Sequence, residues 1–139
     1  MTVTQTQATP LLMHNTMRIT PGHLEEFKQA VRRAVEFVQQ HGPQLTVQVF
    51  IDDSELIAHS FQLYPNSAAV LRHWSLSDPY ISDVMQHCTV ESLQVYGEPD
   101  KEVTEGLSTM LADGVARLTG SHHVGFVRRQ KALPETQPW

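Results

Sequence analysis

Residues 45–64, LTVQVFIDDSELIAHSFQLY, decide the fold of this chain. Apolar and polar residues alternate through residues 45–52, as they do in a strand with one buried face, and Phe50 is the one large exception. Residues 52–54, Asp-Asp-Ser, have the composition of a turn, and residues 56–64 return to an extended pattern. The stretch therefore predicts a β-hairpin.

A strand and a helix are predicted before the hairpin. Residues 11–19 are rich in Leu, Met, Thr and Ile and end at Thr20-Pro21-Gly22, which is typical of a helix start. From residue 24 to 38, apolar residues recur at steps of three and four, which predicts an amphipathic helix. Gly42-Pro43 then ends the helix.

The same two kinds of element follow the hairpin. Apolar spacing over residues 70–88 predicts a helical pair kinked near Pro79, and alternation over residues 89–96 predicts a strand. The order strand, helix, strand, strand, helix, strand predicts an α+β chain with the ferredoxin-like βαββαβ fold.

The chain is expected to hold one domain. We assign residues 11–97 to the ferredoxin-like part and residues 98–130 to a C-terminal extension of it, with residues 1–10 and 131–139 as flexible tails. In the extension, a short apolar stripe at residues 103–111 predicts a helix. Two extended stretches are expected after it, at residues 115–119 and 122–129.

Composition narrows the classes of partner. The net charge is -5 with only ten Lys and Arg, so nucleic acid and anionic membrane surfaces are unlikely partners. Cys88 is the single cysteine, no apolar run approaches the roughly 20 residues of a membrane span, and the start lacks the pattern of a signal peptide. We expect a cytoplasmic protein.

The second face of the sheet indicates a partner. Both helices of this fold pack on one face. If Val47, Val49, Phe61, Leu93 and Val95 face the helices, the opposite face carries only uncharged residues, namely Thr46, Gln48, Phe50, Ala58, Ser60, Gln62, Ser92, Gln94 and Tyr96. A solvated face would collect charged side chains. The pattern therefore predicts that a second copy closes the sheet into a dimeric α+β barrel; a monomer with a mildly polar sheet is the alternative.

The helix start at residues 20–22, the hairpin, and residues 73–80, His-Trp-Ser-Leu-Ser-Asp-Pro-Tyr, together resemble the antibiotic-biosynthesis-monooxygenase family over about residues 11–96. This resemblance implies a homodimer with a pocket between sheet and helices in each subunit. In catalytic members it implies oxidation of aromatic or polyketide-like substrates by O₂ without metal or flavin. Many relatives of this shape have no known activity, so a non-catalytic ligand-binding or structural dimer is the alternative.

One branch of the same superfamily degrades haem, and the chain resembles it at two positions. Asn15 and Trp74 stand where that branch has a pocket asparagine and tryptophan. Val84 stands where an axial histidine would be expected, and His87 would need a shifted helix to replace it. Haem degradation is therefore a minor alternative, and we expect no cofactor.

The candidate catalytic residues lie on the first strand. Asn15 is an amide in mid-strand that must bind a ligand or satisfy backbone groups, because an unpaired buried amide is costly. His14 could act as a general base, and Arg18 could stabilise a developing anion.

Aromatic and apolar residues are the candidates for binding a small ligand. Trp74 and Tyr64 could form a wall for a flat molecule, although core packing explains large aromatics equally well. The other candidates are Tyr80, Val84 and His87.

Other chemistry has little support in the sequence. His122 and His123 are adjacent, so on a strand their rings would point to opposite faces and could not share a metal ion. His59 shares a face with Ile57 and Phe61 and is interpreted as a hydrogen-bonded core histidine. Cys88 has no basic neighbour that would make it a nucleophile. No metal site is predicted.

Overall fold

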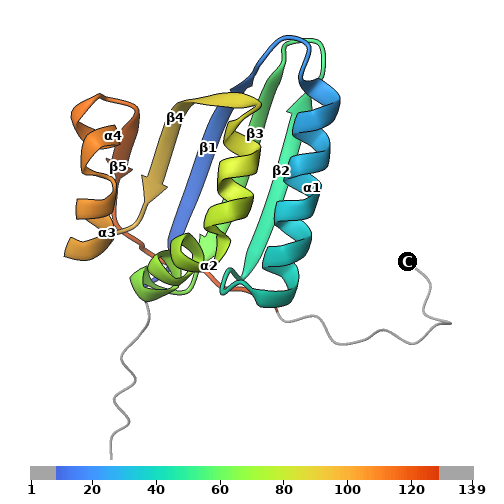
Figure 1. Ribbon diagram of the computed structural model, residues 1–139. Helices are drawn as coiled ribbons and strands as arrows, with labels where there is room; N and C mark the ends of the chain where they lie inside the picture. The colour runs from blue at the N-terminus through green and yellow to red at the C-terminus, as the bar shows by residue number, and fades with distance from the viewer. Residues whose placement is uncertain (1–8, 129–139) are drawn as a thin grey trace, which may run out of the picture.

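The computed structural model describes residues 9–128. Its elements, in chain order, are β1 (Leu11–Ile19), α1 (Leu24–His41), β2 (Thr46–Asp52), β3 (Ile57–Tyr64), α2 (Ser67–Met85), β4 (Cys88–Tyr96), α3 (Lys101–Gly106), α4 (Ser108–Ala112) and β5 (Ala116–Thr119). The first six confirm the predicted βαββαβ order (Figure 1). The predicted tails, residues 1–10 and 131–139, lie outside the described residues except for Thr9 and Pro10.

The strands of the described chain form one sheet in the order β2-β3-β1-β4-β5. β1 is central and pairs antiparallel with β3 and β4, and β2 pairs antiparallel with β3. β5 adds a parallel strand beside β4. The ferredoxin-like α+β fold with a C-terminal helix and strand extension is therefore confirmed. The second extended stretch forms no strand over residues 122–128, and Arg129 lies outside the described residues.

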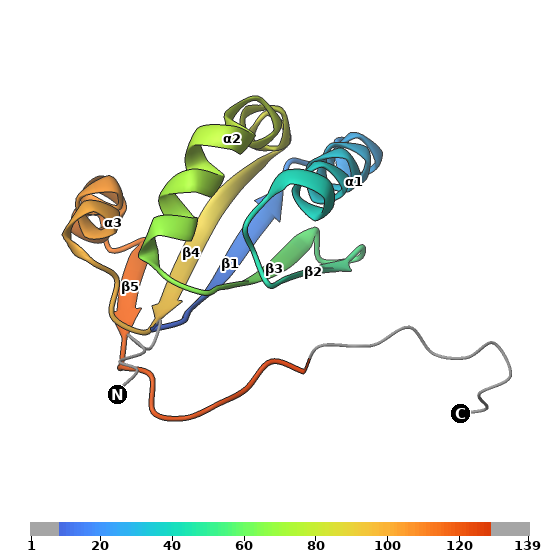
Figure 2. The same ribbon diagram turned by 90° about the horizontal axis from the view of Figure 1, so that it is seen from below.

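Helices α1 and α2 cover one face of this sheet (Figure 2). α1 buries Phe27 and Val38 from the predicted apolar stripe, and Ala30, which was not part of it. α2 is one helix that runs through Pro79, where two kinked pieces were predicted. It changes direction along its length (Figure 1), because a proline inside a helix removes a backbone hydrogen bond. Among residues 9–128, no helix combines the length and apolar character that crossing a bilayer requires.

The two faces of β3 are the reverse of the prediction. Val49 of β2 pairs with Ser60, and directly paired residues share a face of the sheet. Ala58, Ser60 and Gln62 therefore face the helices, and Phe61 faces away. The prediction failed because β3 carries apolar residues on both faces. A shift of the strand register by one residue moves every side chain to the other face of the sheet. Only pairing with a neighbouring strand sets that register.

We call the side of the sheet away from α1 and α2 the open face; its residues include Leu12, His14, Phe50, His59, Phe61, Gln94 and Tyr96. The prediction was right for β2 and β4, whose uncharged residues lie on this side. The interpretation of His59 as a core histidine is wrong, because the residue is only half-buried and lies on the open face.

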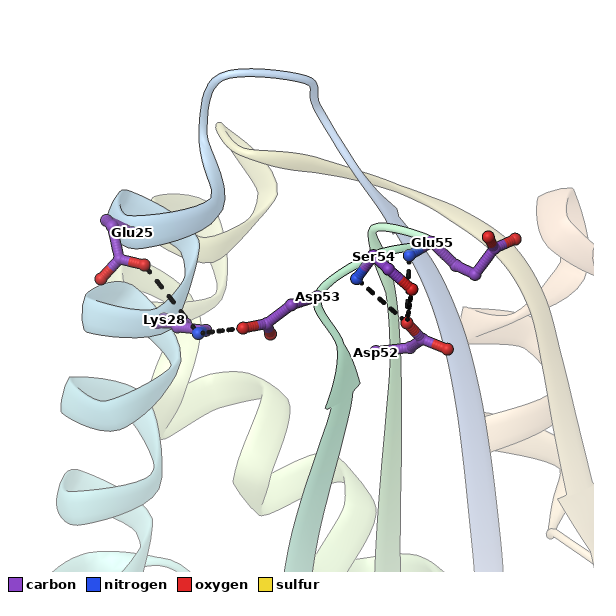
Figure 3. A network of polar contacts seen from close by, with 6 residues as sticks. All are labelled: Glu25, Lys28, Asp52, Asp53, Ser54 and Glu55. Carbon is purple, nitrogen blue, oxygen red and sulfur yellow. Dashed lines mark hydrogen bonds and ion pairs between the residues drawn. The ribbon is translucent and has the colours of Figure 1, made fainter.

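Hydrogen bonds shape the hairpin turn between β2 and β3 (Figure 3). The Asp52 carboxylate accepts bonds from the backbone N–H groups of Glu55 and Ser54, at 3.0 and 3.1 Å, and from the Ser54 hydroxyl at 2.8 Å. These bonds, led by that from Glu55, hold the pKa of Asp52 below its usual range. Lys28 of α1 lies 2.9 Å from the carboxylate of Asp53, which ties the turn to the helix.

The C-terminal extension packs against α2 through Trp74 and Gly106. A Cβ atom on Gly106 would lie 2.4 Å from Cζ3 of the Trp74 ring, closer than any unstrained contact. The ring therefore needs a glycine in α3.

We expect Gly106→Ala to destabilise the protein by about 1–3 kcal/mol, because the rigid indole cannot yield without moving its neighbours. Urea unfolding measures this cost. Gly125→Ala is the matched control, since a Cβ there meets only Nε2 of His122 at 3.4 Å. An unchanged or higher stability of Gly106→Ala would contradict the close packing, because alanine is otherwise the better helix former.

Candidate functional site

The apolar layer between sheet and helices is interrupted in its middle. One buried cluster lies around Leu11, Met13 and Tyr64, and a second lies around Met17 and Phe27. Between them, Asn15 of β1 pairs with Ser60 of β3. This polar row separates two apolar clusters that would otherwise be continuous.

A cleft of about 120 Å³ lies over the polar row, bounded by α1, β2 and α2. Its walls are mostly aliphatic and include Val35, Val49 and Ile81. Several wall residues are half-buried, so the cleft is open to solvent. Among residues 9–128, no Asp, Glu, Lys or Arg lines it.

The cleft floor carries a chain of hydrogen bonds. The Gln44 amide N–H donates to the Gln62 carbonyl oxygen at 3.0 Å, and the Gln62 amide N–H donates to the Ser60 hydroxyl at 3.2 Å. The Tyr64 hydroxyl also donates to the Gln62 oxygen, at 2.6 Å. Burial raises the pKa of Tyr64, so its phenol stays protonated. These groups hold each other in place.

Oδ1 of Asn15, like Oε1 of Gln44, is buried without a hydrogen-bond partner among the described residues. Leaving a buried acceptor unsatisfied costs about 1–3 kcal/mol. The atom belongs to a residue that lines the cleft. A ligand with an O–H or N–H group would relieve that cost.

His73 of α2 is a site residue that sequence analysis missed as a candidate. Its side chain is buried, lines the cleft, and has Nδ1 2.9 Å from the Ser77 hydroxyl. Burial lowers the pKa of His73 to about 4, so the ring is neutral at pH 7. The four-residue spacing of His73 and Ser77 on the face that also holds Ala69 and Val70 was the available signal.

The predicted catalytic residues do not come together within one chain. Asn15 lines the cleft, whereas His14 and Arg18 lie on the other side of β1, because successive strand residues alternate. Nε2 of His14 lies 2.9 Å from Nδ1 of His59. Arg18 donates to the Glu91 carboxylate at 2.6 Å.

Of the predicted ligand-binding residues, Val84 lines the cleft and the others lie outside it. Trp74 packs on Gly106, and Tyr64 reaches the cleft floor only through Gln62. Tyr80 stacks on Phe37 of α1, with ring centroids 4.4 Å apart. Nδ1 of His87 lies 3.0 Å from Nδ1 of His23, just before α1.

Two further groups bear on chemistry. Burial raises the pKa of the Cys88 thiol to about 11, which keeps it protonated. Over residues 9–128, no group of three or more His, Cys, Asp and Glu side chains is placed to hold a metal ion.

The chain matches no family model and no curated protein. Its fold is similar to that of MupZ from Pseudomonas fluorescens, with a TM-score of 0.66 and 16% identity over 90% of this chain and 99% of MupZ. SnoaB, a cofactor-independent oxygenase from Streptomyces nogalater, gives a TM-score of 0.57 and 13% identity over 68% of this chain and 97% of its own.

A proposed antibiotic biosynthesis monooxygenase from Caulobacter crescentus gives a TM-score of 0.55 and 14% identity over 64% of this chain and 87% of its own. At identities this low, the structural matches show a shared fold and nothing finer. The predicted resemblance to the antibiotic-biosynthesis-monooxygenase family is confirmed at that level.

Burial of His73 predicts a pH dependence of stability. Its pKa of about 4 lies below the value of about 6.5 in an unfolded chain, so the unfolded state binds more protons between these values. The free energy of unfolding should therefore fall as the pH drops from 6.5 towards 4, by on the order of 2 kcal/mol from this residue.

Urea unfolding at several pH values between 4 and 7 measures this effect. In His73→Gln the decrease should be smaller by that amount, because the amide does not titrate. His41→Gln changes an exposed histidine of α1 and should keep the wild-type slope. Equal slopes in all three proteins would contradict the burial of a neutral His73.

Proposed function

We propose that the protein binds a small aromatic or apolar molecule with a hydroxyl group in the cleft, and that it oxidises this molecule with O₂ without metal or flavin. The buried, unpartnered Oδ1 of Asn15 in a mostly aliphatic cleft carries the proposal. A substrate hydroxyl that donates to this atom would be both bound and oriented. The fold shared with a cofactor-independent oxygenase supports the class of reaction.

The size of the cleft sets what can enter it. An engineered cavity of about 150 Å³ in another protein holds benzene, so a cleft of about 120 Å³ suits a single ring or the end of a larger molecule. Because the cleft is open to solvent, the rest of a polyketide-like substrate could extend outwards.

The proposed chemistry uses two residues. Asn15 accepts the substrate hydroxyl, and the neutral ring of His73, held at Nδ1 by Ser77, takes a proton from the substrate. The resulting anion is electron-rich and reduces O₂. When a methylene becomes a carbonyl, one oxygen atom enters the product and the other leaves as water, so the electrons lost by carbon are those gained by O₂.

Haem does not fit the residues of this site. The histidine that lines the cleft is bonded to Ser77, Val84 offers no ligand, and His87 lies outside beside His23. The cleft is also well below the roughly 300–1,000 Å³ of sites for larger ligands. The proposed reaction therefore does not use haem.

A non-catalytic ligand-binding protein is the second candidate. The absence of Asp, Glu, Lys and Arg from the cleft lining favours it, because only neutral dipoles would stabilise a developing charge. A pKa as low as that of His73 also makes a weak base.

We also propose that a second copy of the chain covers the open face. Most of the exposed large apolar residues lie on this face or on the segment beside it, namely Leu12, Leu45, Phe50, Tyr96, Val124, Phe126 and Val127. His14 and Arg18 belong to this face, so in the proposed dimer their side chains would lie near the second copy. Large apolar areas on a protein surface are typical of interaction sites.

Ligand binding tests the role of Asn15. Phenol and toluene have nearly the same size, and only phenol can donate a hydrogen bond. Asn15→Leu should weaken phenol binding about tenfold, the equivalent of about 1.4 kcal/mol, and leave toluene binding equal or stronger. Titrations followed by NMR chemical shifts measure both affinities.

Thr16→Val is the matched control, because Thr16 is the next residue of β1 and lies on the open face. It should leave phenol binding in the cleft unchanged. If Asn15→Leu binds phenol as tightly as the wild type, Asn15 is a structural amide and the proposed site is wrong.

Oxygen uptake separates the two candidate functions. With anthrone as an electron-rich probe and a chelator present, an oxygenase should consume one O₂ per quinone formed, at a rate above that in buffer. Asn15→Leu should lower that rate about tenfold. Phenol binding without any oxygen uptake above buffer would reject the oxygenase and leave the ligand-binding protein.

A further inference from the structure

The C-terminal segment of the described chain, residues 120–128, runs across the open face. Figure 2 shows it leaving β5 and passing beneath the sheet towards β2, on the side away from α1 and α2. We call these residues the arm. A hollow of about 700 Å³ lies between the arm and the sheet, and Leu12, Leu45, Leu63 and Tyr96 line it.

Three apolar residues of the arm stay exposed within one chain. Val124, Phe126 and Val127 are 77%, 80% and 54% exposed, although an apolar hollow lies beside them. Within residues 9–128, Gly120 accepts a backbone hydrogen bond from Gly97, and residues 121–128 form none. Phe126 and Val127 line the hollow without filling it, so the arm and the sheet both keep exposed apolar surface within one chain.

We propose that two copies of the chain exchange arms, so that the arm of each fills the hollow on the open face of the other. This proposal rests on the dimer proposed above and adds the contact that holds it. A two-fold axis makes the exchange reciprocal, because each chain offers one arm and one hollow. The side chains of Phe126 and Val124 would then be buried against Leu12, Leu63 and Tyr96.

The area of the open face supports a second copy with an arm. The five strands differ in length from four to nine residues, and at about 3.3 Å per residue and about 4.8 Å between strands they present roughly 590 Å². A stable interface buries about 800 Å² on each partner. The sheet face alone falls short of this value, and the exposed residues of the arm supply additional apolar area.

The chemistry of the hollow points to the same occupant. Its lining, within the part of the chain that the structure describes, contains no Asp, Glu, Lys or Arg, which disfavours nucleic acid and charged peptides. The apolar residues Val124, Phe126 and Val127 in the arm of an identical chain match it.

Sedimentation of charged variants tests the contact. The wild type should be a dimer. The arm variant Phe126→Asp and the hollow variant Leu12→Asp should each raise the dissociation constant of the dimer at least tenfold. Leu76→Asp, on the helix side in α2, is the matched control, because Leu76 is 37% exposed and Leu12 is 36%. Circular dichroism checks that each variant is folded.

Mixing the two variants tests the exchange itself. In an exchanged heterodimer, the intact arm of the Leu12→Asp chain meets the intact hollow of the Phe126→Asp chain. One of the two contacts is then restored. The mixture should then associate more tightly than either variant alone. If each arm packs on its own chain, every chain in the mixture keeps one defect and association is not restored.

The outcomes distinguish arm exchange from a dimer that forms without it. A wild-type dimer whose dissociation constant is unchanged by Phe126→Asp, or variants that fail to complement each other, would overturn the arm exchange and leave the dimer. A monomeric wild type would overturn both. None of these results bears on ligand binding by Asn15, which is measured in the cleft on the opposite side of the sheet.

Discussion

The unsatisfied amide oxygen of Asn15 is the constraint on which the candidate site depends. In β1, Met13 and Met17 each join an apolar cluster, and the asparagine between them prevents the clusters from merging. Its partner across the strand pair is Ser60, so the polar break continues across the sheet. A sheet that packed fully against α1 and α2 would have no cleft here. The fold therefore keeps a local cost in stability at the place where a ligand could relieve it.

The rest of the sheet is organised around this break. Hydrogen bonds link Tyr64, Gln62 and Gln44, whereas Oδ1 of Asn15 and Oε1 of Gln44 remain acceptors without a partner in the described chain. Burial keeps the His73 ring neutral, and its bond to Ser77 fixes its position. The Asn15 amide oxygen and the neutral His73 ring suit a neutral hydroxyl compound better than an anion, because no Lys or Arg among residues 9–128 lines the cleft.

The two faces of the sheet carry different surface features. The helix side carries the cleft, and the open face carries the exposed apolar residues and the arm. Since neighbouring residues of β1 point to opposite sides, Asn15 and His14 serve different surfaces although they are adjacent in sequence. A partner on the open face would leave the cleft accessible from the helix side.

The sequence by itself determined the order of elements, because hydrophobic period, helix starts and turn residues are local signals. It also singled out Asn15, since a mid-strand amide is visible without coordinates. Only the tertiary structure decided which face Ser60 and Phe61 occupy, because strand pairing with β2 sets that choice. Strand alternation is a local signal and already places Asn15 and Arg18 on opposite faces. Only the tertiary structure brought His73 to the cleft, since burial and contact between distant segments arise only when helices pack on the sheet.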